Sequence, residues 1–300
     1  MLHYDTAARQ PGSRFIRDDN LSTVLIFVHG LSGDATTTWT HNTTHAYFPD
    51  LVAADTLFRD VSVYVYEYPS SFSGGTFRIN ELAENMRLVL ERDGVLQRRE
   101  LIFVAHSMGG LVTRALLLKY RDLGQRVRLL YFFGTPTTGA DIARIASLIT
   151  ANPQVEQLRA TSPSLEDLQR DWLAANFQIP AYCGYERRPT LPIGLVVAPQ
   201  SAMTLCNRPA DPIDADHMSI AKPEDRAMCR MLLLAKRFPR RRHERPRHRR
   251  RNSRSSRESP KMLERSRRPS SSRPLAARRS IRSSSSFYRA GPAEFRSLRL

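Results

Sequence analysis

The sequence predicts an α/β protein in which helices cover both faces of a mostly parallel sheet. Short apolar runs alternate along the chain with longer stretches whose apolar residues recur at helical spacing. Such alternation is typical of βαβ units. The runs are apolar throughout, as strands buried on both faces of a sheet are. At residues 106–110 one of these runs changes through a glycine-rich turn directly into a helical pattern.

Six segments have the apolar pattern of strands. They are Val24–Val28, Val61–Tyr68, Leu101–Ala105, Val127–Phe133, Ile179–Cys183 and Ile193–Ala198. In the second segment valine and tyrosine alternate, so we expect the valines on one face of the sheet and the tyrosines on the other.

Besides the stretch that follows residues 106–110, three segments have helical patterns. The apolar spacing predicts a helix over Ile79–Glu91. A longer helical stretch covers residues 140–177, where Pro153 and Pro163 interrupt it. We expect this stretch to form a small helical cap over the functional site. Pro223 opens a last amphipathic helix.

Charge divides the chain into two parts. Residues 237–300 carry 21 Arg and one Lys against four Glu, whereas the first 236 residues carry 24 basic and 25 acidic side chains. We therefore expect a folded domain over residues 1–238 and a disordered Arg- and Ser-rich tail over 239–300, which has too few apolar residues for a core. Such a tail binds anionic membranes or nucleic acid non-specifically. The alternative is a solvated extension without a specific role.

Cysteine usage and the N-terminus favour a cytoplasmic protein. Cys183, Cys206 and Cys229 are widely spaced and odd in number. They predict neither a disulfide framework nor a zinc site, and they fit a reducing compartment. The first residues lack the apolar core of a secretory signal. No apolar run approaches the length that spans a membrane, so peripheral contact with anionic membranes is the alternative to free solution.

Residues 101–110 read LIFVAHSMGG and carry the strongest chemical signal. A strand, a sharp turn with serine at its apex and a helix resemble the nucleophile elbow of α/β-hydrolases. This turn strains the backbone of Ser107 and holds its hydroxyl clear of the sheet. Strand and helix nearly touch there, so the flanking positions must be small. Gly109 fits, and Ala105 stands where glycine is usual. The alternative is a buried serine in an ordinary βα turn.

A second glycine-rich loop, HGLSGD at His29–Asp34, also follows a predicted strand. In acyl-transfer enzymes such a loop supplies one backbone amide of the oxyanion hole, which stabilises the tetrahedral intermediate. The expected pair of amides belongs to Leu31 and to Met108, the residue after the nucleophile. A plain glycine-rich turn is the alternative.

Ser107 needs a general base, which this fold places in the loop after its last strand. We expect that strand to end at Ala198, and His217 is the only histidine between Ala198 and residue 242. His217 is therefore the predicted base.

The other histidines are weaker candidates. His106 adjoins the nucleophile, but in an elbow we expect its side chain to point elsewhere. His41 and His45 are four residues apart, which could suggest metal ligation. No third ligand accompanies them, so a loop or helix surface is the better interpretation.

The acid of a triad would lie between Ser107 and His217 in the sequence, after the penultimate strand. Glu186 is the first acid after Ile179–Cys183 and is our predicted partner of the imidazole. Asp211 and Asp214 are the alternative acids, on the loop that carries the histidine. Glu186 could instead form a surface ion pair with a neighbouring arginine.

The ordered set of motifs resembles the lipase- and esterase-type α/β-hydrolases, in particular the SERAC1-like and inositol-deacylase-like serine esterases. The resemblance covers roughly residues 20–235. It rests on Phe27–Asp34 with Thr38-Trp39, Tyr66–Pro69, Ala105–Val112, Phe133–Pro136 with Gly139, Tyr185-Glu186, Val196-Val197, Ser201-Ala202, Asp216-His217 and Ser219–Pro223. The resemblance implies a serine hydrolase that cleaves esters or thioesters, with some relatives acting on glycerophospholipids or lipid anchors.

These observations predict an α/β-hydrolase fold that cleaves carboxylic esters, including lipid substrates, through a Ser107–His217–Glu186 triad. No metal or organic cofactor is expected, because the triad supplies nucleophile, base and acid from side chains alone. The alternative function is an inactive scaffold that acts as a binding module and is tethered to polyanions by its basic tail.

Overall fold

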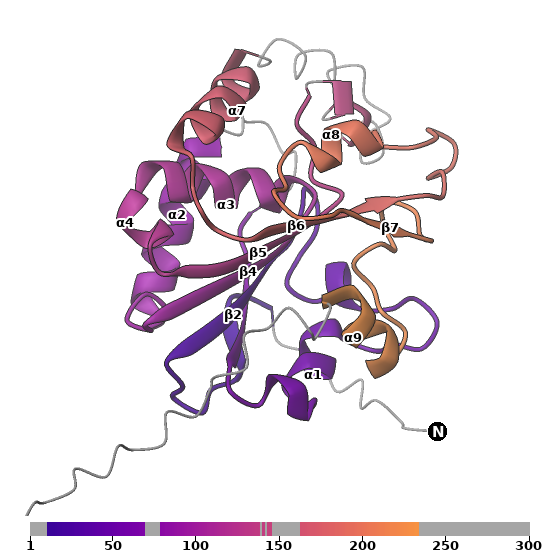
Figure 1. Cartoon of the computed structure of the whole chain (residues 1–300). Helices are drawn as coiled ribbons and strands as arrows, with labels where there is room; N and C mark the ends of the chain where they lie inside the picture. The colour runs from indigo at the N-terminus through magenta and orange to yellow at the C-terminus, as the bar shows by residue number, and fades with distance from the viewer. Residues whose placement is uncertain (1–10, 70–78, 139, 142, 146–162, 234–300) are drawn as a thin grey trace, which may run out of the picture. The chain divides into compact units, whose positions relative to one another are not determined.

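The computed structural model of the protein describes residues 11–69, 79–138, 140–141, 143–145 and 163–233 (Figure 1). The basic tail expected at 239–300, the domain boundary expected at residue 238 and residues 146–162 of the expected cap lie outside the described residues.

The described residues form a seven-stranded sheet with the strand order β1-β3-β2-β4-β5-β6-β7. Neighbouring strands are parallel, except that β1 runs antiparallel to β3 at one edge. A mostly parallel sheet is the fold class that the sequence predicts. The strands are β1 (Arg14–Arg17), β2 (Thr23–Val28), β3 (Ser62–Tyr66), β4 (Glu100–His106), β5 (Val127–Phe133), β6 (Ala181–Glu186) and β7 (Asp211–Ile213).

The central strand β4 shows why continuous apolar runs become parallel strands here. It pairs with β2 on one side and with β5 on the other, and every residue from Leu101 to His106 is buried. Helices cover both faces of the sheet, so an apolar side chain leaves water whichever way it points. Because β4 lies between β2 and β5, its carboxyl end lies at the middle of the sheet edge, between two other strand ends.

Helices lie on both faces of the sheet (Figure 1). The apolar sides of α2, α3 and α7 join one core cluster, and those of α1 and α9 join the other. The α-helices are α1 (Phe48–Ala53), α2 (Ile79–Arg92), α3 (Met108–Lys119), α4 (Arg121–Gly124), α7 (Pro163–Ala175), α8 (Pro199–Met203) and α9 (Arg226–Leu233), and Thr37–Trp39 and Thr56–Phe58 form short 3-10 helices. Within the described part of the chain, none of the helices is both long enough and apolar enough to cross a bilayer.

The alternating valines and tyrosines of β3 separate as the sequence predicts. Val63 and Val65 pack into the cluster beneath α1, while Tyr64 and Tyr66 pack into the cluster beneath α2. Both sets are fully buried. The buried phenols each keep a polar partner, because Tyr64 donates to Asp93 and Tyr66 donates to Asn85 at 2.8 Å.

The expectation of a strand over Ile193–Ala198 is wrong. Pro192 and Pro199 flank this segment, and Gly194 adopts a positive φ of 92°. The amides of Val196 and Val197 donate to a carboxylate rather than to a neighbouring strand. Their apolar side chains enter a separate small cluster, so burial without a strand explains the apolar run.

The last strand of the sheet is β7 instead, three residues long and without a continuous apolar pattern. The antiparallel edge strand β1 also lacks one, because its four residues are only half-buried. Edge strands bury fewer side chains, so apolar runs do not mark them.

The expectation that the cysteines form no disulfide is also wrong. Cys183 in β6 and Cys206, which follows α8, are joined by a disulfide, with their Cα atoms 5.9 Å apart. Cys229 is free and buried. Sequence spacing misses the pair, because the turn that carries α8 back toward β6 brings together two cysteines 23 positions apart.

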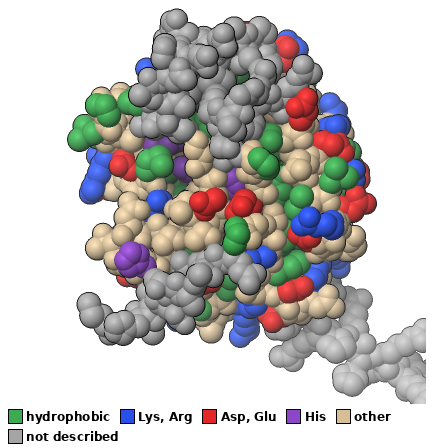
Figure 2. Space-filling view, turned by 180° about the vertical axis from the view of Figure 1, so that it is seen from behind, with side chains coloured by type: hydrophobic (Ala, Val, Ile, Leu, Met, Phe, Trp, Pro, Cys, Tyr) green, Lys and Arg blue, Asp and Glu red, His purple; other side chains and the backbone are tan. Residues whose placement is uncertain are grey.

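Acidic and basic side chains lie interspersed on the described part of the face in Figure 2. This fits the near balance of acidic and basic residues over the first 236 positions. The large excess of arginine belongs to residues 237–300.

Candidate active site

Ser107 sits at the turn between β4 and α3 in a strained backbone conformation. Its φ is 54° and its ψ is −128°, a region that non-glycine residues rarely adopt and that costs about 1–3 kcal/mol. The backbone amide of Ser107 donates to the Phe133 carbonyl at 2.8 Å, which holds the turn against β5. The side chain is 2% exposed. The predicted elbow conformation is therefore present.

Gly109 allows the close approach of strand and helix that this turn requires. A Cβ atom there would come within 2.3 Å of the His29 carbonyl oxygen and 2.5 Å of the Val28 carbonyl oxygen. The methyl group of Ala105, in contrast, is accommodated within the buried centre of the sheet. The departure from glycine at Ala105 thus leaves the turn intact.

His217 reaches Ser107 from the loop that follows β7. Its Nε2 lies 3.0 Å from the Ser107 hydroxyl, and its Nδ1 lies 3.1 Å from Glu186 Oε2. The ring is 2% exposed. The backbone amide of His217 donates to the Thr190 hydroxyl at 3.0 Å. Thr190 is a contact that no sequence pattern signals.

Glu186 is the last residue of β6 and is 1% exposed. One carboxylate oxygen, Oε1, accepts hydrogen bonds from the amides of Val196 (2.5 Å) and Val197 (2.7 Å). The other oxygen, Oε2, faces His217. The acid is therefore oriented by backbone groups on one side and presented to the imidazole on the other.

The two alternative acids are engaged elsewhere. Asp211 accepts a hydrogen bond from the Tyr131 hydroxyl at 2.8 Å. Asp214 is exposed and pairs with Arg188, whose Nε lies 2.8 Å from Oδ1. This ion pair lowers the pKa of Asp214 below its usual value. The structure brings Glu186, and neither aspartate, to the His217 ring.

The two residues expected to supply the oxyanion amides flank Ser107 from different elements. Met108 is the first residue of α3, where the backbone amide has no partner within its own helix. Leu31 follows β2 in the glycine-rich loop and lines the cavity beside Ser107. Gly30, next to Leu31, comes so close that a Cβ there would lie 2.7 Å from Ser107 Cβ.

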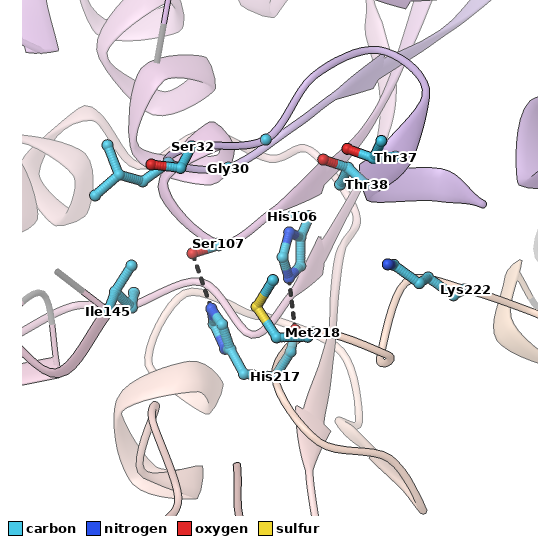
Figure 3. A pocket seen from close by; sticks show the side chains of 12 residues that line it. Gly30, Ser32, Thr37, Thr38, His106, Ser107, Ile145, His217, Met218 and Lys222 are labelled. Carbon is cyan, nitrogen blue, oxygen red and sulfur yellow. Dashed lines mark hydrogen bonds between the residues drawn. The ribbon is translucent and has the colours of Figure 1, made fainter. Parts of the chain in front are cut away.

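A cavity of about 220 Å³ opens onto Ser107 and His217. Figure 3 shows Ile145 on one side of it and Thr37, Thr38 and Lys222 on the other. The described residues that line it also include Gly30, Leu31, Ser32, Gly33, His106 and Met218. Ile145 is the one described residue of the 140–177 segment in this lining. The described apolar residues of α7, which belongs to the same segment, pack into the core against α3 and do not line the cavity.

The expectation that His106 points away from the site is wrong. Its Nε2 lies 2.9 Å from the His217 carbonyl oxygen, and its ring lines the cavity. A carbonyl only accepts, so Nε2 carries the proton and Nδ1 is an unpaired acceptor in the interior. Burial, with a smaller contribution from the charge of His217, lowers the pKa of His106 to about 3. The ring is therefore neutral at ordinary pH.

No group of three His, Cys, Asp or Glu side chains among the described residues is placed to hold a metal ion. His41 accepts hydrogen bonds through Nδ1 from the amides of Thr43 and Thr44, at 3.3 and 3.1 Å. Its ring therefore serves a local turn.

Comparisons with known proteins bear on the family and the fold of the chain. Protein SERAC1 of Bos taurus is 28% identical over 242 residues, which covers 67% of this chain and 36% of that protein. The Mus musculus protein is 27% identical with the same coverage, so the chain spans 36% of the length of these relatives. The mature lipase BlEst2 of Bacillus licheniformis has a similar fold, with a TM-score of 0.51 and 16% identity over 75% of this chain and 97% of that one. A model of the alpha/beta hydrolase family matches residues 25–278, and the chain therefore belongs to that family.

Proposed function

We propose that this chain is a serine hydrolase that cleaves carboxylic esters through an acyl-enzyme intermediate. The observation that carries the proposal is the continuous line of hydrogen-bonded groups from Ser107 through His217 to Glu186, at the wall of an open cavity. Nucleophile, base and orienting acid within hydrogen-bond reach of one another are the geometric signature of nucleophilic catalysis.

His217 would act first as a general base. With Glu186 Oε2 accepting from Nδ1–H, the proton stays on Nδ1, and Nε2 presents its lone pair to the Ser107 hydroxyl. As Ser107 Oγ attacks the ester carbonyl carbon, its proton passes to Nε2. The resulting imidazolium lies against the Glu186 carboxylate, which stabilises it.

The tetrahedral intermediate would place its oxyanion between the amides of Met108 and Leu31. Fixed backbone N–H groups stabilise such a charge without reorganising during the reaction. Collapse of the intermediate breaks the ester C–O bond, and the alcohol leaves with the proton from His217. Water, deprotonated by His217, then attacks the acyl-enzyme and releases the acid and Ser107.

Lipid esters are part of the proposal for two reasons. Ile145 gives one side of the cavity an apolar side chain, and the Bacillus licheniformis protein with a similar fold is a lipase. Thioesters react by the same steps. A tail that attaches the enzyme to an anionic surface would bring it to such substrates.

A fluorophosphonate probe tests the proposal directly. It should label the native protein at Ser107 and leave Ser107→Ala unlabelled. Hydrolysis of a short p-nitrophenyl ester should fall by about a millionfold in the variant. Its circular dichroism should be unchanged, because only one oxygen is lost. A native protein that does not react with the probe would instead favour the inactive binding scaffold. More than a few per cent of residual activity in Ser107→Ala would falsify the nucleophile assignment.

A further inference from the structure

Lys222 is a cation in the wall of the cavity that holds Ser107, and neither the triad nor the oxyanion amides account for it. It lies just before α9, five positions after His217, and its side chain is half-buried. The described lining of the cavity contains no Asp or Glu. Partial burial in this wall removes part of the hydration of the Lys222 ammonium group. Because the charged form is less well solvated there, the pKa of Lys222 is lowered.

The ammonium group keeps capacity for a ligand. The described residues give it one hydrogen bond, from Nζ to Asn42 Oδ1 at 3.1 Å, and no ion pair with a described carboxylate. An ammonium carries three donors. Two of them are therefore available to an anion that enters the cavity.

The charges of two carboxylates, Asp216 and Asp34, partly offset the effect of burial on the pKa of Lys222. Both are occupied by local turns. Asp34 accepts from the amides of Thr36 and Thr37 at 2.7 and 2.6 Å, and from the Thr37 hydroxyl at 2.7 Å.

Asp216 is used in the same way within its own loop. Its Oδ1 accepts from the amides of Met218 and Ser219 at 3.1 and 2.8 Å, and from the Ser219 hydroxyl. These carboxylates reduce the positive electrostatic potential around Lys222, but they do not contact its ammonium group.

The cavity has Lys222 with Thr37 and Thr38 on one side, and Ile145 and Ser32 on the opposite side. Figure 3 shows Thr37, Thr38 and Lys222 together, Ile145 across the pocket, and Ser107 between the two sides. An ester with its acyl chain on the Ile145 side places its alcohol on the side of Lys222. Since Ser107 and Lys222 line one cavity of about 220 Å³, a charged group on the alcohol would lie only a few bonds from the reacting carbonyl.

We infer that Lys222 selects esters whose alcohol carries an anionic group, a carboxylate or a phosphate, close to the ester bond. The inference rests on the proposed ester hydrolysis at Ser107. Lys222 is a specificity residue, because it contacts a part of the substrate that does not react. Its ammonium group binds the anion by charge and hydrogen bonding within a partly desolvated wall, where both are stronger than in water.

The experiment compares matched butyrate esters, so that the acyl chain stays constant. One pair is 1-butyryl-glycerol and 1-butyryl-glycerol 3-phosphate. The other pair is the butyrate ester of 3-hydroxypropionate and that of its amide. The native protein should favour the anionic member in kcat/KM, chiefly through a lower KM. In Lys222→Met that preference should fall by about 10- to 100-fold, which is the usual range for a hydrogen bond to a charged group. Lys222→Arg should retain most of it.

Two control variants separate the charge from its surroundings. Asn42→Ala removes the tether of the ammonium group but keeps the charge, so the preference should persist. Lys119→Met removes an exposed lysine of α3 that pairs with Glu84, so it changes the net charge equally without touching the cavity. Its preference should match that of the native protein.

A salt series supplies a readout that needs no variant. In the native protein, KM for the anionic esters should rise with NaCl, while KM for the neutral esters should stay constant. If Lys222→Met does not fold, a KM for the anionic esters that does not rise with NaCl would still overturn the inference. Preference in both pairs would show that Lys222 responds to charge, and preference in one pair alone would assign that anion.

Failure of the inference is distinguishable from failure of the proposed function. A native protein that cleaves none of the four esters and does not react with the fluorophosphonate would refute ester hydrolysis itself. A native protein that cleaves neutral and anionic members equally, with no change in Lys222→Met, would overturn the role of Lys222 and leave ester hydrolysis intact.

Discussion

At the scale of single residues, the catalytic geometry is held by a second set of hydrogen bonds. The backbone amide of Ser107 donates to the Phe133 carbonyl, that of His217 donates to the Thr190 hydroxyl, and two backbone amides hold the Glu186 carboxylate. Each group is therefore positioned by neighbours that take no part in bond making. Such support keeps reacting atoms within the tolerance that catalysis requires.

The assignment of the acid is open to direct test. Glu186→Gln removes the charge that faces His217 Nδ1 and should lower kcat by roughly a thousand- to ten-thousandfold, because the imidazolium loses its stabilising partner. Asp211→Asn and Asp214→Asn should change kcat by less than about threefold, since neither side chain contacts the imidazole. Steady-state kinetics on one short ester compares all three. An inactive aspartate variant beside a fully active Glu186→Gln would move the acid onto the histidine loop.

His106 should make the stability of the fold depend on pH. Burial lowers the pKa of His106 to about 3, from the ordinary histidine value of about 6.5. The folded-state pKa thus lies below that of the unfolded chain. The contribution of the neutral ring is therefore complete above pH 6.5 and is lost as the pH falls toward 3. The loss should be on the order of a few kcal/mol.

His106→Gln is the matched variant, because a glutamine amide can donate to the His217 carbonyl but does not titrate. Urea unfolding between pH 3.5 and 7 should give a shallower pH dependence for this variant than for the native protein. His29 is also buried with a lowered pKa, so some pH dependence should remain. If the free energy of unfolding changes equally with pH in the two proteins, the pKa of His106 is the same in the folded and the unfolded chain, and the prediction is wrong.

At the scale of elements, the sequence predicts those parts of the fold that bury a continuous apolar surface. The central strands and the β4–α3 turn appear where the apolar run and the glycines predict them. The strand β7 does not, because its three residues include only one buried apolar side chain, Ile213, and are too few to show a period. For Ile193–Ala198 the error is the opposite one, because the apolar run predicts a strand that does not form. Its valines are buried in a turn whose backbone amides donate to the Glu186 carboxylate.

The same distinction applies to the site. Ser107, Glu186 and His217 are identified by type and by order along the chain, and the structure brings them together. Thr190 reaches the site only through a loop conformation that has no local sequence signature, and the motif that contains Lys222 does not itself predict that its side chain lines the cavity. The disulfide between Cys183 and Cys206 is missed for the same reason.

A buried arginine holds α7 against α3. Arg114 of α3 is 1% exposed, and its Nη2 donates to the Leu168 carbonyl at 3.3 Å and to Gln169 Oε1 at 2.7 Å. Its guanidinium lies 5.2 Å from the centre of the Trp172 ring. Burial desolvates the charge of Arg114 and lowers its pKa to about 9.

Removing the Arg114 side chain should therefore destabilise this helix pair. Arg114→Ala leaves a cavity against Trp172 and should lower the free energy of unfolding by about 2–4 kcal/mol. Arg114→Met fills most of that volume and buries no charge, so its loss should be much smaller. Chemical denaturation measures both variants. Equal losses would show that the contacts of the guanidinium, rather than its volume, hold α7.

At the scale of the whole molecule, charge separates two regions of the chain. The first 236 residues are nearly balanced, and the excess of arginine lies in residues 237–300. All the groups of the proposed active site, and the closing helix α9, precede residue 237. Ester hydrolysis and contact with polyanions are therefore expected to depend on different parts of the sequence.

Truncation after Arg240 tests this division. The shortened protein should keep its melting temperature and its turnover of a short ester within about twofold, because the core and the site lie upstream. It should lose affinity for anionic vesicles and for nucleic acid. In the full chain that affinity should fall steeply as salt rises, since counterion release and screening both act on exposed arginine.

A matched variant separates charge from length in this experiment. Replacing the arginines of residues 241–300 by glutamine keeps the chain length and removes the charge, so it should bind vesicles as weakly as the truncated protein. Hydrolysis of esters presented on anionic vesicles should fall in both variants, if attachment to the surface delivers the substrate. Hydrolysis of the short soluble ester should stay unchanged in both. A truncated protein that is insoluble, or inactive on the short ester, would show that residues beyond 240 stabilise the domain itself and that its boundary lies further along the chain.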